Sequence, residues 1–531
     1  IILQNLKTES AKLYGKDANY INDISNYIKK FVCPDSWKNL KVQLIHTDKS
    51  NLPVSKFSAN GEFKNINTFA CLNSEKAFWL ENKCIKCTNC SQICPHSAIS
   101  IKQVKTESLI NAPDDFKFIK NSNGTSFCLF INKNKCTGCG NCVNICPTKA
   151  LILKKYLNTN KDFFDKLDAI TEDKGTKNLA YFQNYYSCNS SCTGCMEIMY
   201  YKLLGSLFGS HLNIINATGC SSIYNGGIDC SPFKTDSKGF GTSFVSNLFE
   251  DNAEFGYGIT YGYNASRENF IKTIKQNITL FSEKFKQNLQ KFLKDENNFT
   301  LCQQIYENLS LETPQNKLDN EVKQNVQFLI PMTNFIVGGD GWAYDIDFGG
   351  LDHIISLNKN VNILILDNEV YSNTGGQTSK ATNLGAKTKY TQEKQTPKKD
   401  LFLSLFQYKN LYFSKVNFMA NKNQCIKSFV DAVNHEGPSV ILAYCPCLNH
   451  KIEMSNSIVQ AQNATKSGYF NLITYKNGIL TQDSEPNFNL LENFILSEGR
   501  YKSISNKTLT KLIESKKEEF DFYKKLTEIL K

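Results

Sequence analysis

The sequence lacks any long apolar run, and stretches such as Val361–Leu366 fall far short of the roughly 20 residues that span a bilayer. We therefore expect no membrane span. It also lacks a long basic run, although lysine and arginine (61) outnumber aspartate and glutamate (50), so we expect no nucleic-acid partner. Proline is scarce (12), and no signal segment opens the sequence. Because residue 1 is Ile1 rather than Met, we expect a part of a longer chain.

Cysteine, by contrast, is abundant, with 20 residues that occur mainly in clusters. A secreted disulfide scaffold is usually short and loop-rich, whereas clustered cysteines in a long chain are more typical of intracellular metal binding. We therefore expect an intracellular protein of a reducing compartment, either the cytoplasm or an anaerobic organelle. The net charge of +11 would favour encounter with acidic redox carriers.

The chain divides into segments of different character. Residues 1–80 contain one helical pattern, Tyr20–Phe31, followed by polar sequence, and we interpret them as the tail of a preceding domain and a linker. Residues 81–155 hold the clustered cysteine motifs, and residues 156–187 form a polar connector. From residue 188 to residue 531, short apolar strands alternate with helices, which is typical of a parallel α/β sheet.

Within this last region the apolar pattern predicts individual elements. One long amphipathic helix is predicted over Ser266–Asp295, inserted in the α/β domain, and another over Leu509–Leu530, with its charges on a solvated face. Strands are predicted at Asn334–Val337, Val361–Leu366 and Ser439–Tyr444, with a helix at Leu351–Leu357.

Two near-copies of one cysteine motif stand in residues 81–155. Each has the spacing C-x2-C-x2-C-x3-C-P, which is the signature of bacterial two-cluster ferredoxins. In these folds the fourth cysteine of each motif ligates the other cluster. We therefore expect one [4Fe–4S] cluster on Cys84, Cys87, Cys90 and Cys146, and a second on Cys136, Cys139, Cys142 and Cys94.

Zinc is the alternative metal, because C-x2-C pairs also bind zinc. A zinc site needs four ligands, and it gives no reason for a third closely spaced cysteine or for the prolines that follow, Pro95 and Pro147. The motifs thus favour two iron–sulfur clusters that carry electrons and do not themselves catalyse a reaction.

A third set of cysteines lies in the α/β region. Cys192 and Cys195 stand on either side of Thr-Gly, and Cys220 follows another Thr-Gly pair. Glycine beside cysteine suits loops that approach an inorganic cluster closely. A fourth thiol would have to come from Cys445 or Cys447, and ordinary buried cysteine remains an equal alternative on these residues alone.

The predicted strand Asn334–Val337 runs into Gly338-Gly-Asp-Gly-Trp342, and the predicted strand Val361–Leu366 runs into an Asp-Asn pair. A Gly-Asp-Gly segment followed, after a helix and a strand, by Asn is the thiamine diphosphate motif. Magnesium prefers oxygen ligands from carboxylates, amides and phosphates, and a helix N-terminus favours the diphosphate. Magnesium ligands would be Asp340, Asn368 and the carbonyl of Val370, with the diphosphate supplying the rest.

Longer stretches of the sequence resemble pyruvate:ferredoxin oxidoreductase, namely Pro53–Phe57, Ala217–Tyr224, Asn247–Gly256, Gly339–His353 and Asp367–Gln377. The resemblance implies the C-terminal half of an enzyme that converts pyruvate and coenzyme A to acetyl-CoA and carbon dioxide. Electrons would pass through three [4Fe–4S] clusters to ferredoxin or flavodoxin. The implied N-terminal half, which would bind most of the pyruvate and coenzyme A, is not in this sequence, and the complete enzyme would be a homodimer.

The resemblance also implies roles for particular residues. Cys447, rather than Cys445, would hold the third cluster together with Cys192, Cys195 and Cys220, and Asn373 would reach the reacting substrate. Thiamine diphosphate would be contacted by Glu197, Cys220, Gly339, Asp340, Gly341, Trp342, Asn368, Glu369, Val370, Tyr371, Ser372 and Asn373.

The predicted fold class is therefore α/β, with a bacterial two-[4Fe–4S] ferredoxin-like domain followed by a thiamine diphosphate-binding parallel-sheet domain. The chain departs from the family pattern at Met196, Ile198 and Met199, in the segment 225–230, and at Asn368, where the family usually has threonine. Two alternative functions stay open: another 2-oxoacid:acceptor oxidoreductase, and a non-catalytic iron–sulfur electron-transfer protein that has lost thiamine chemistry.

Overall fold

The computed structural model of the chain describes residues 75–155, 160–170, 178–181, 184–186, 191–224, 231–236 and 238–530. All of them lie in one compact unit of the chain. The predicted helix Tyr20–Phe31 and the segment 225–230 lie outside the described residues. Within the described ranges, no helix is both long enough and apolar enough to cross a membrane.

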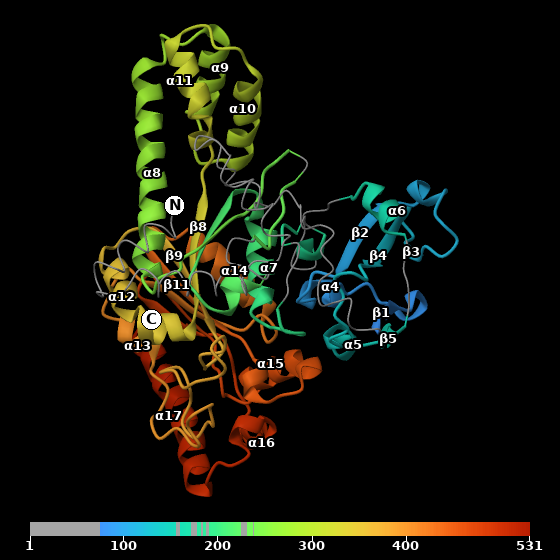
Figure 1. Cartoon of the computed structure of the whole chain (residues 1–531), viewed down its shortest axis with the longest axis vertical. Coiled ribbons are helices and arrows are strands. Elements are labelled where there is room, and N and C mark those ends of the chain that lie inside the picture. Colours follow the sequence, from blue (N-terminus) through green and yellow to red (C-terminus); the bar gives the residue numbers. More distant parts are fainter. Residues whose placement is uncertain are drawn as a thin grey trace, which may run out of the picture. The chain divides into compact units, whose positions relative to one another are not determined.

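A sheet with the strand order β13-β12-β10-β11-β9-β8-β6-β7 dominates the described chain (Figure 1). The strands from β10 to β7 pair in parallel, and β12 and β13 add an antiparallel hairpin at one edge. This confirms the predicted parallel α/β sheet. The strands are β6 (Leu212–Asn216), β7 (Ser243–Ser246), β8 (Thr333–Gly339), β9 (Val361–Asp367), β10 (Tyr412–Val416), β11 (Pro438–Tyr444), β12 (Ile473–Lys476) and β13 (Ile479–Gln482).

Both faces of this sheet are covered, as parallel sheets require. Along β9, Leu364 and Leu366 pack into one apolar cluster, whereas Ile363 and Ile365 pack into another, because successive side chains point to opposite faces. The covering helices are α7 (Ile198–Leu207), α12 (Phe348–Ser356), α13 (Leu401–Leu405), α14 (Lys422–Val433), α15 (Ser457–Lys466), α16 (Leu491–Ser497) and α17 (Asn506–Ile529). The predicted helices at Leu351–Leu357 and Leu509–Leu530 correspond to α12 and α17.

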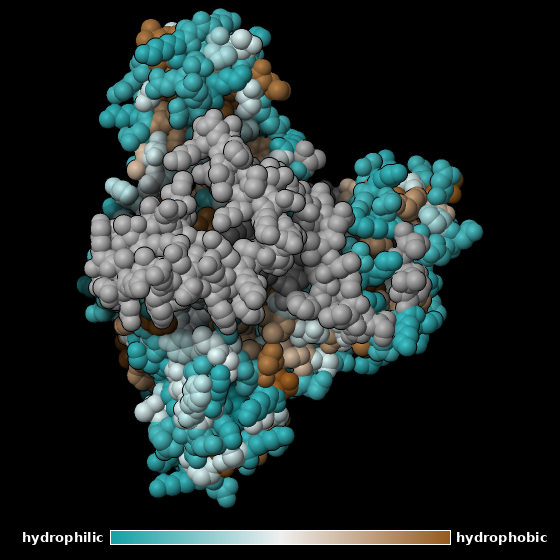
Figure 2. Space-filling model, in the orientation of Figure 1, coloured by the Kyte–Doolittle hydropathy of each residue, from teal (hydrophilic) through white to brown (hydrophobic). Residues whose placement is uncertain are grey.

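A helical insertion between β7 and β8 has its own apolar core. The prediction of one helix over Ser266–Asp295 is wrong, because the chain turns back between α8 and α9. This turn brings Phe285 and Leu289 against Phe270 and Ile274, which a straight helix would leave exposed. The outer surface of the insertion is mainly hydrophilic (Figure 2). Its helices are α8 (Asn252–Asn277), α9 (Glu283–Phe292), α10 (Phe299–Leu311) and α11 (Lys317–Gln324).

The cysteine-rich region forms a separate module of short elements. Strand β1 pairs with β5, so the module includes residues before the predicted boundary at residue 81. It also extends past residue 155, because Phe164 of α6 stacks on Phe130 of β4 with ring centroids 5.2 Å apart. The elements are β1 (Lys76–Trp79), α4 (Asn89–Ile93), β2 (Ile99–Lys105), β3 (Phe118–Lys120), β4 (Thr125–Ile131), α5 (Asn141–Ile145), β5 (Leu151–Lys154) and α6 (Lys161–Lys166).

Candidate functional site

The cysteine-rich module contains two cavities, each lined by four thiols. In each cavity three thiols come from one motif and the fourth comes from the other, which is the arrangement of cross-ligated clusters. No three His, Cys, Asp or Glu side chains in the described ranges are placed to hold a single metal ion. A cavity ringed by four thiols is instead what a cluster of several irons requires. The first cavity is lined by Cys84, Cys87, Cys90 and Cys146, and the second by Cys94, Cys136, Cys139 and Cys142.

The surroundings of these thiols suit anionic sulfur bound to iron. Burial, followed by the charges of Cys87 and Cys84, raises the pKa of Cys90 to about 12, so the thiol of Cys90 stays protonated unless it binds a metal. Backbone N–H groups nevertheless point at the sulfurs: Ala98 N lies 3.3 Å from Cys94 Sγ, and Ala150 N lies 3.2 Å from Cys146 Sγ. Such N–H···S contacts stabilise clusters and tune their potentials.

The third set of cysteines meets at one place in the α/β domain. Cys195 interacts electrostatically with Cys447 and Cys220, and Cys220 interacts with Cys447 and Cys192. Cys445 is fully buried, and its thiol donates to the carbonyl of Ala443 in β11 at 3.3 Å. Cys445 also interacts with Cys195, so Cys447 stays the predicted fourth thiol of this set.

This third set lies next to the second cavity of the cysteine-rich module. His96, which follows Cys94-Pro95, accepts a hydrogen bond from the N–H of Gly194 at its Nε2 atom (3.1 Å). Gly194 stands directly before Cys195. The third set thus lies beside the second cavity of the cysteine-rich module.

The residues predicted to hold magnesium lie at the ends of neighbouring strands. Asp340 follows β8 and Asn368 follows β9, and Gly339 pairs with Leu366 in the sheet. Asp340 is 1% exposed, and its Oδ2 atom accepts a hydrogen bond from the hydroxyl of Ser379 at 2.6 Å. Burial and the charge of Asp367 raise the pKa of Asp340 well above its ordinary value, so a cation here would be strongly stabilised.

Asn368 presents its oxygen to this place. Its Nδ2 atom donates to Glu197 and to Ser372, whereas its Oδ1 atom is buried and has no hydrogen-bond partner among the described residues. A buried acceptor without a donor is costly, and a metal ion would satisfy it. Asp340 and Asn368 therefore fit the predicted magnesium site.

The Gly-Asp-Gly turn is shaped by close contacts. A Cβ atom on Gly341 would lie 2.5 Å from the ring of Tyr371, so only glycine allows this ring to pack there. At Gly339 a Cβ atom would meet nothing within 4 Å, which leaves open space beside the backbone. The indole N–H of Trp342 donates to Asp347 at 2.6 Å, so this side chain is held inside the domain and only its main chain can approach a diphosphate.

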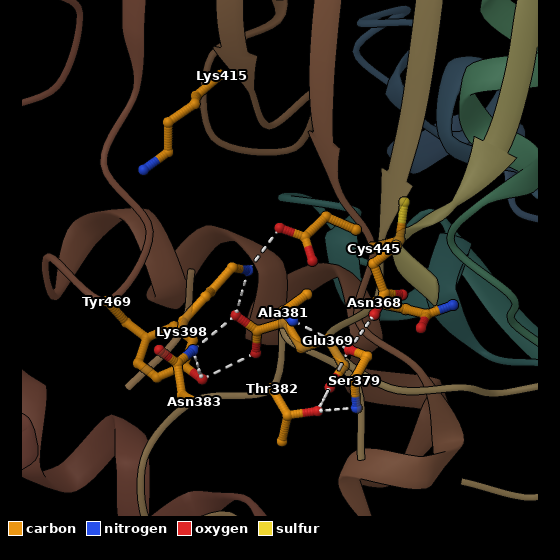
Figure 3. A network of polar contacts seen from close by, with 12 residues as sticks. Asn368, Glu369, Ser379, Ala381, Thr382, Asn383, Lys398, Lys415, Cys445 and Tyr469 are labelled. Carbon is orange, nitrogen blue, oxygen red and sulfur yellow. Dashed lines mark hydrogen bonds and ion pairs between the residues drawn. The ribbon is translucent and has the colours of Figure 1, made fainter. Parts of the chain in front are cut away.

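The loop after β9 depends on a buried charge network (Figure 3). Glu369 is 1% exposed and has a left-handed backbone (φ 62°), which is unusual for this residue type. Its carboxylate accepts hydrogen bonds from Asn383, Lys398, Tyr469 and Arg500 at 2.6–3.0 Å. The side chain of Glu369, predicted to touch thiamine diphosphate, is therefore committed to the protein interior, where it fixes the loop.

A chain of side-chain contacts joins the predicted magnesium site to the third set of thiols. Glu197, at the start of α7, accepts hydrogen bonds from Tyr224 and Asn368. Asn368 donates to the Ser372 hydroxyl at 3.0 Å, and this hydroxyl lies 3.3 Å from Cys220 Sγ. The side chain of Ser372 thus joins the two candidate centres.

The departures from the family pattern around Glu197 have a structural explanation. Met196, Ile198 and Met199 are each at most 2% exposed and belong to the apolar core beside the sheet. Their side chains pack in the core, while Glu197 accepts a hydrogen bond from Asn368 at the site.

Of the remaining predicted residues, Val370 is buried and Asn373 is exposed. Ser379, Lys398 and Arg500 support the site from distant segments and are not predicted from the sequence. His450 is not predicted either, although its Nε2 atom lies 2.7 Å from the carbonyl oxygen of Asn368. The one sequence signal for His450 is its position three residues after Cys447.

Comparison with known proteins supports both parts of this description. Residues 83–150 match the model of a 4Fe-4S dicluster domain, and residues 328–443 match the C-terminal TPP-binding domain of thiamine pyrophosphate enzymes. These matches confirm the predicted fold class. The module of residues 83–150 contains both cysteine motifs, and the second match contains the Gly-Asp-Gly turn and Asn368.

Curated relatives match nearly the whole chain. Pyruvate:ferredoxin oxidoreductase of Moorella thermoacetica is 34% identical over 90% of this chain and 44% of its own length. A probable pyruvate-flavodoxin oxidoreductase of Escherichia coli is 33% identical over 89% of this chain and 43% of its length. A mitochondrial NADP(+) pyruvate dehydrogenase of Euglena gracilis is 34% identical over 82% of this chain and 25% of its length. The chain thus spans less than half the length of the relatives it matches.

Proposed function

Because this chain is similar over most of its length to pyruvate:ferredoxin and pyruvate-flavodoxin oxidoreductases, we propose that it is the thiamine- and cluster-binding part of such an enzyme. The reaction is the oxidative decarboxylation of pyruvate with coenzyme A to acetyl-CoA and carbon dioxide. Ferredoxin or flavodoxin receives the electrons. The observation that carries the proposal is the contact chain from Asn368 through Ser372 to Cys220, which joins a magnesium site to a four-thiol set.

Bound thiamine diphosphate supplies the carbon nucleophile and the electron sink for decarboxylating a 2-oxoacid. Asp340 and the Oδ1 atom of Asn368 hold its magnesium ion, with the carbonyl of Val370 as a third oxygen. The main chain of Gly339–Trp342 approaches the diphosphate, since Gly339 leaves open space and the following turn begins a helix. Asn373 is exposed at this loop, where a substrate would cover it.

Glu197 is a buried carboxyl group beside the proposed magnesium ligand Asn368. Burial raises the pKa of its carboxyl, while hydrogen bonds from Tyr224 and Asn368 oppose this shift. The carboxyl of Glu197 therefore accepts a proton more readily than an exposed glutamate does, which suits a group that exchanges a proton with a cofactor. Its contact with Asn368 also fixes which atom of that amide faces the metal.

Three [4Fe–4S] clusters would carry the electrons away. The third set of thiols (Cys192, Cys195, Cys220 and Cys447) would hold the cluster nearest thiamine diphosphate. The thiols of the second cavity would hold the next cluster, since His96 joins that cavity to Gly194, and the thiols of the first cavity would hold the last one. Because electrons enter at one end of this series, the acceptor docks at the other.

Two further functions compete with this proposal. Another 2-oxoacid could be the substrate, and the sites described here recognise the cofactor far more than the substrate. A non-catalytic electron-transfer role would make the thiamine site superfluous, whereas Asp340, Asn368 and Glu197 are all in place.

The test uses the complete protein, prepared without oxygen and reconstituted with iron, sulfide, magnesium and thiamine diphosphate. We expect about 12 Fe per chain, from four irons in each of three clusters, and coenzyme A-dependent reduction of ferredoxin with pyruvate. Faster reduction with 2-oxoglutarate or another 2-oxoacid would reassign the substrate. Full iron content with no reduction by any 2-oxoacid would support the electron-transfer role and contradict the enzyme.

A further inference from the structure

Lys202 is a buried cation that lies between the two cavities of the cysteine-rich module. It belongs to α7 of the α/β domain, and it is 8% exposed. Its Nζ atom donates to the carbonyl of Ser91 and, at 3.3 Å, to the carbonyl of Cys94. Ser91 follows Cys90, which lines the first cavity, and Cys94 lines the second. One ammonium group therefore approaches a thiol of each cavity.

No carboxylate among the described residues compensates the positive charge of Lys202. Among the described residues it forms no salt bridge, and the ionisable side chains that act on it are the thiols of Cys94 and Cys90. A buried cation without a carboxylate partner is costly unless another negative charge compensates it.

We propose that Lys202 raises the reduction potentials of both clusters in the cysteine-rich module. Higher potentials favour the transfer of electrons from the α/β domain to this module. This inference rests on the proposed binding of clusters by the two four-thiol cavities. Reduction adds one negative charge to a cluster, and a buried cation close to it stabilises the reduced form more than the oxidised form. Removing the cation therefore makes both clusters harder to reduce.

Lys422 provides a graded comparison. It lies in α14 of the same domain, and its Nζ atom donates to the side-chain oxygens of Asn89 and Gln92 at 2.8 and 2.9 Å. The cysteines that act on it are Cys87 and Cys90, which both line the first cavity. Its removal should affect one cluster, whereas removal of Lys202 should affect two.

Lys102 provides a matched control for a purely structural role. Its Nζ atom also donates to backbone carbonyls at the end of a short helix, those of Phe164, Asp165 and Leu167, at 2.8–3.0 Å. The cysteine that acts on it is Cys128, which belongs to neither cavity. Replacing Lys102 removes the same kind of contact without removing a charge beside a cluster.

The experiment is a potentiometric titration, followed by electron paramagnetic resonance, of the complete reconstituted protein and its Lys202→Met, Lys202→Arg, Lys422→Met and Lys102→Met variants. We expect two of the three midpoint potentials to become more negative in Lys202→Met, and one in Lys422→Met. Lys202→Arg and Lys102→Met should keep the wild-type potentials. Unchanged potentials in an iron-replete Lys202→Met protein would overturn the proposal, as would an equal shift in Lys202→Arg.

If Lys202→Met loses iron, Lys202→Gln and Lys422→Met carry the same test, because glutamine retains a donor for the two carbonyls. Unchanged midpoints in these variants would then contradict the proposal. Pyruvate-dependent activity is measured in parallel on the wild-type protein. Activity with unchanged potentials in the variants would refute only the role of Lys202, whereas absence of clusters from the wild-type protein would refute the proposed function itself.

Discussion

In the cysteine-rich module, two short motifs supply every thiol that lines the two cavities, so the spacing of cysteines within these motifs predicts both thiol sets. The loop after β9, which carries Asn368, is instead held by residues from distant segments. Its key residue, Glu369, is held in a left-handed backbone by side chains from distant parts of the chain, including Lys398, Tyr469 and Arg500. The ligands of the first centre therefore come from its own motifs, whereas the second centre depends on the integrity of the whole α/β domain.

The largest effect is expected from the third thiol set, where loss of one ligand removes a whole cluster. Cys447→Ser in the complete protein should lower the iron content from about 12 to about 8 Fe per chain, because a [4Fe–4S] cluster needs four cysteine ligands. Cys445→Ser is the matched control, since its thiol donates to Ala443 instead. Iron loss in Cys445→Ser but not in Cys447→Ser, measured by chemical iron analysis, would show that the ligand choice is wrong.

The next largest effect is expected in the buried network behind the loop. Arg500 is 3% exposed and contacts the carboxylates of Glu369 and Glu498, each at 2.6 Å. Arg500→Met leaves both carboxylates buried with one cation fewer, which costs about 3–5 kcal/mol. Scanning calorimetry should show a lower unfolding temperature for the α/β domain and no change for the cysteine-rich module.

Arg500→Lys should lose less stability, because lysine keeps the charge but not the planar pair of donors. A variant Arg500→Met with unchanged unfolding temperature and unchanged thiamine diphosphate affinity would contradict the dependence of the loop on this network.

A smaller effect is expected at Asp340, the carboxylate proposed for magnesium. Asp340→Ala removes one charge-assisted contact worth about 1.5–3 kcal/mol, which is roughly a tenfold to 150-fold loss of thiamine diphosphate affinity in titration calorimetry. Asp352→Ala is the control, because Asp352 on α12 accepts a hydrogen bond from the hydroxyl of Tyr408 and is not among the predicted magnesium ligands. Equal thiamine diphosphate affinity in the wild-type protein and in Asp340→Ala would show that the Gly-Asp-Gly segment is only a turn and does not bind the cofactor.

The smallest effect is expected in the helical insertion, in which none of the predicted site residues lies. Asn298 caps α10, where its side-chain oxygen accepts from the N–H of Leu301 at 3.2 Å. Asn298→Ala should cost about 1 kcal/mol of stability in denaturant unfolding. Iron content and thiamine diphosphate affinity should stay at wild-type values, and a loss of either would couple the insertion to the centres.

The difference between local motifs and long-range packing also explains which features the sequence predicts. The parallel sheet and the strand ends that carry Asp340 and Asn368 follow from short apolar runs ending in Gly-Asp-Gly and Asp-Asn. The pairing of Cys146 with the first motif, and of Cys94 with the second, follows from spacing alone. These features are local or repeat a known geometry.

The features that the sequence does not predict depend on packing between distant segments of the chain. The resemblance predicts Glu369 at the cofactor, but its carboxylate binds Asn383 and Arg500 in the protein interior. No spacing of residues near Glu369 in the sequence predicts these two partners. The turn between α8 and α9 was missed because helical periodicity continues through it, and only burial of Phe285 and Leu289 against α8 forces the chain to fold back. The position of Lys202 beside Cys94 depends on how two segments of the chain pack.

The central claim is that the thiamine site feeds electrons into the cysteine-rich module through the third thiol set. The most direct measurement is the reduction of the clusters by pyruvate and coenzyme A in the complete wild-type protein and in Asp340→Ala, followed by electron paramagnetic resonance. We predict that pyruvate reduces the clusters in the wild-type protein only, while dithionite reduces them in both. Pyruvate-driven reduction of the clusters in Asp340→Ala, at ordinary thiamine diphosphate concentration, would contradict this account.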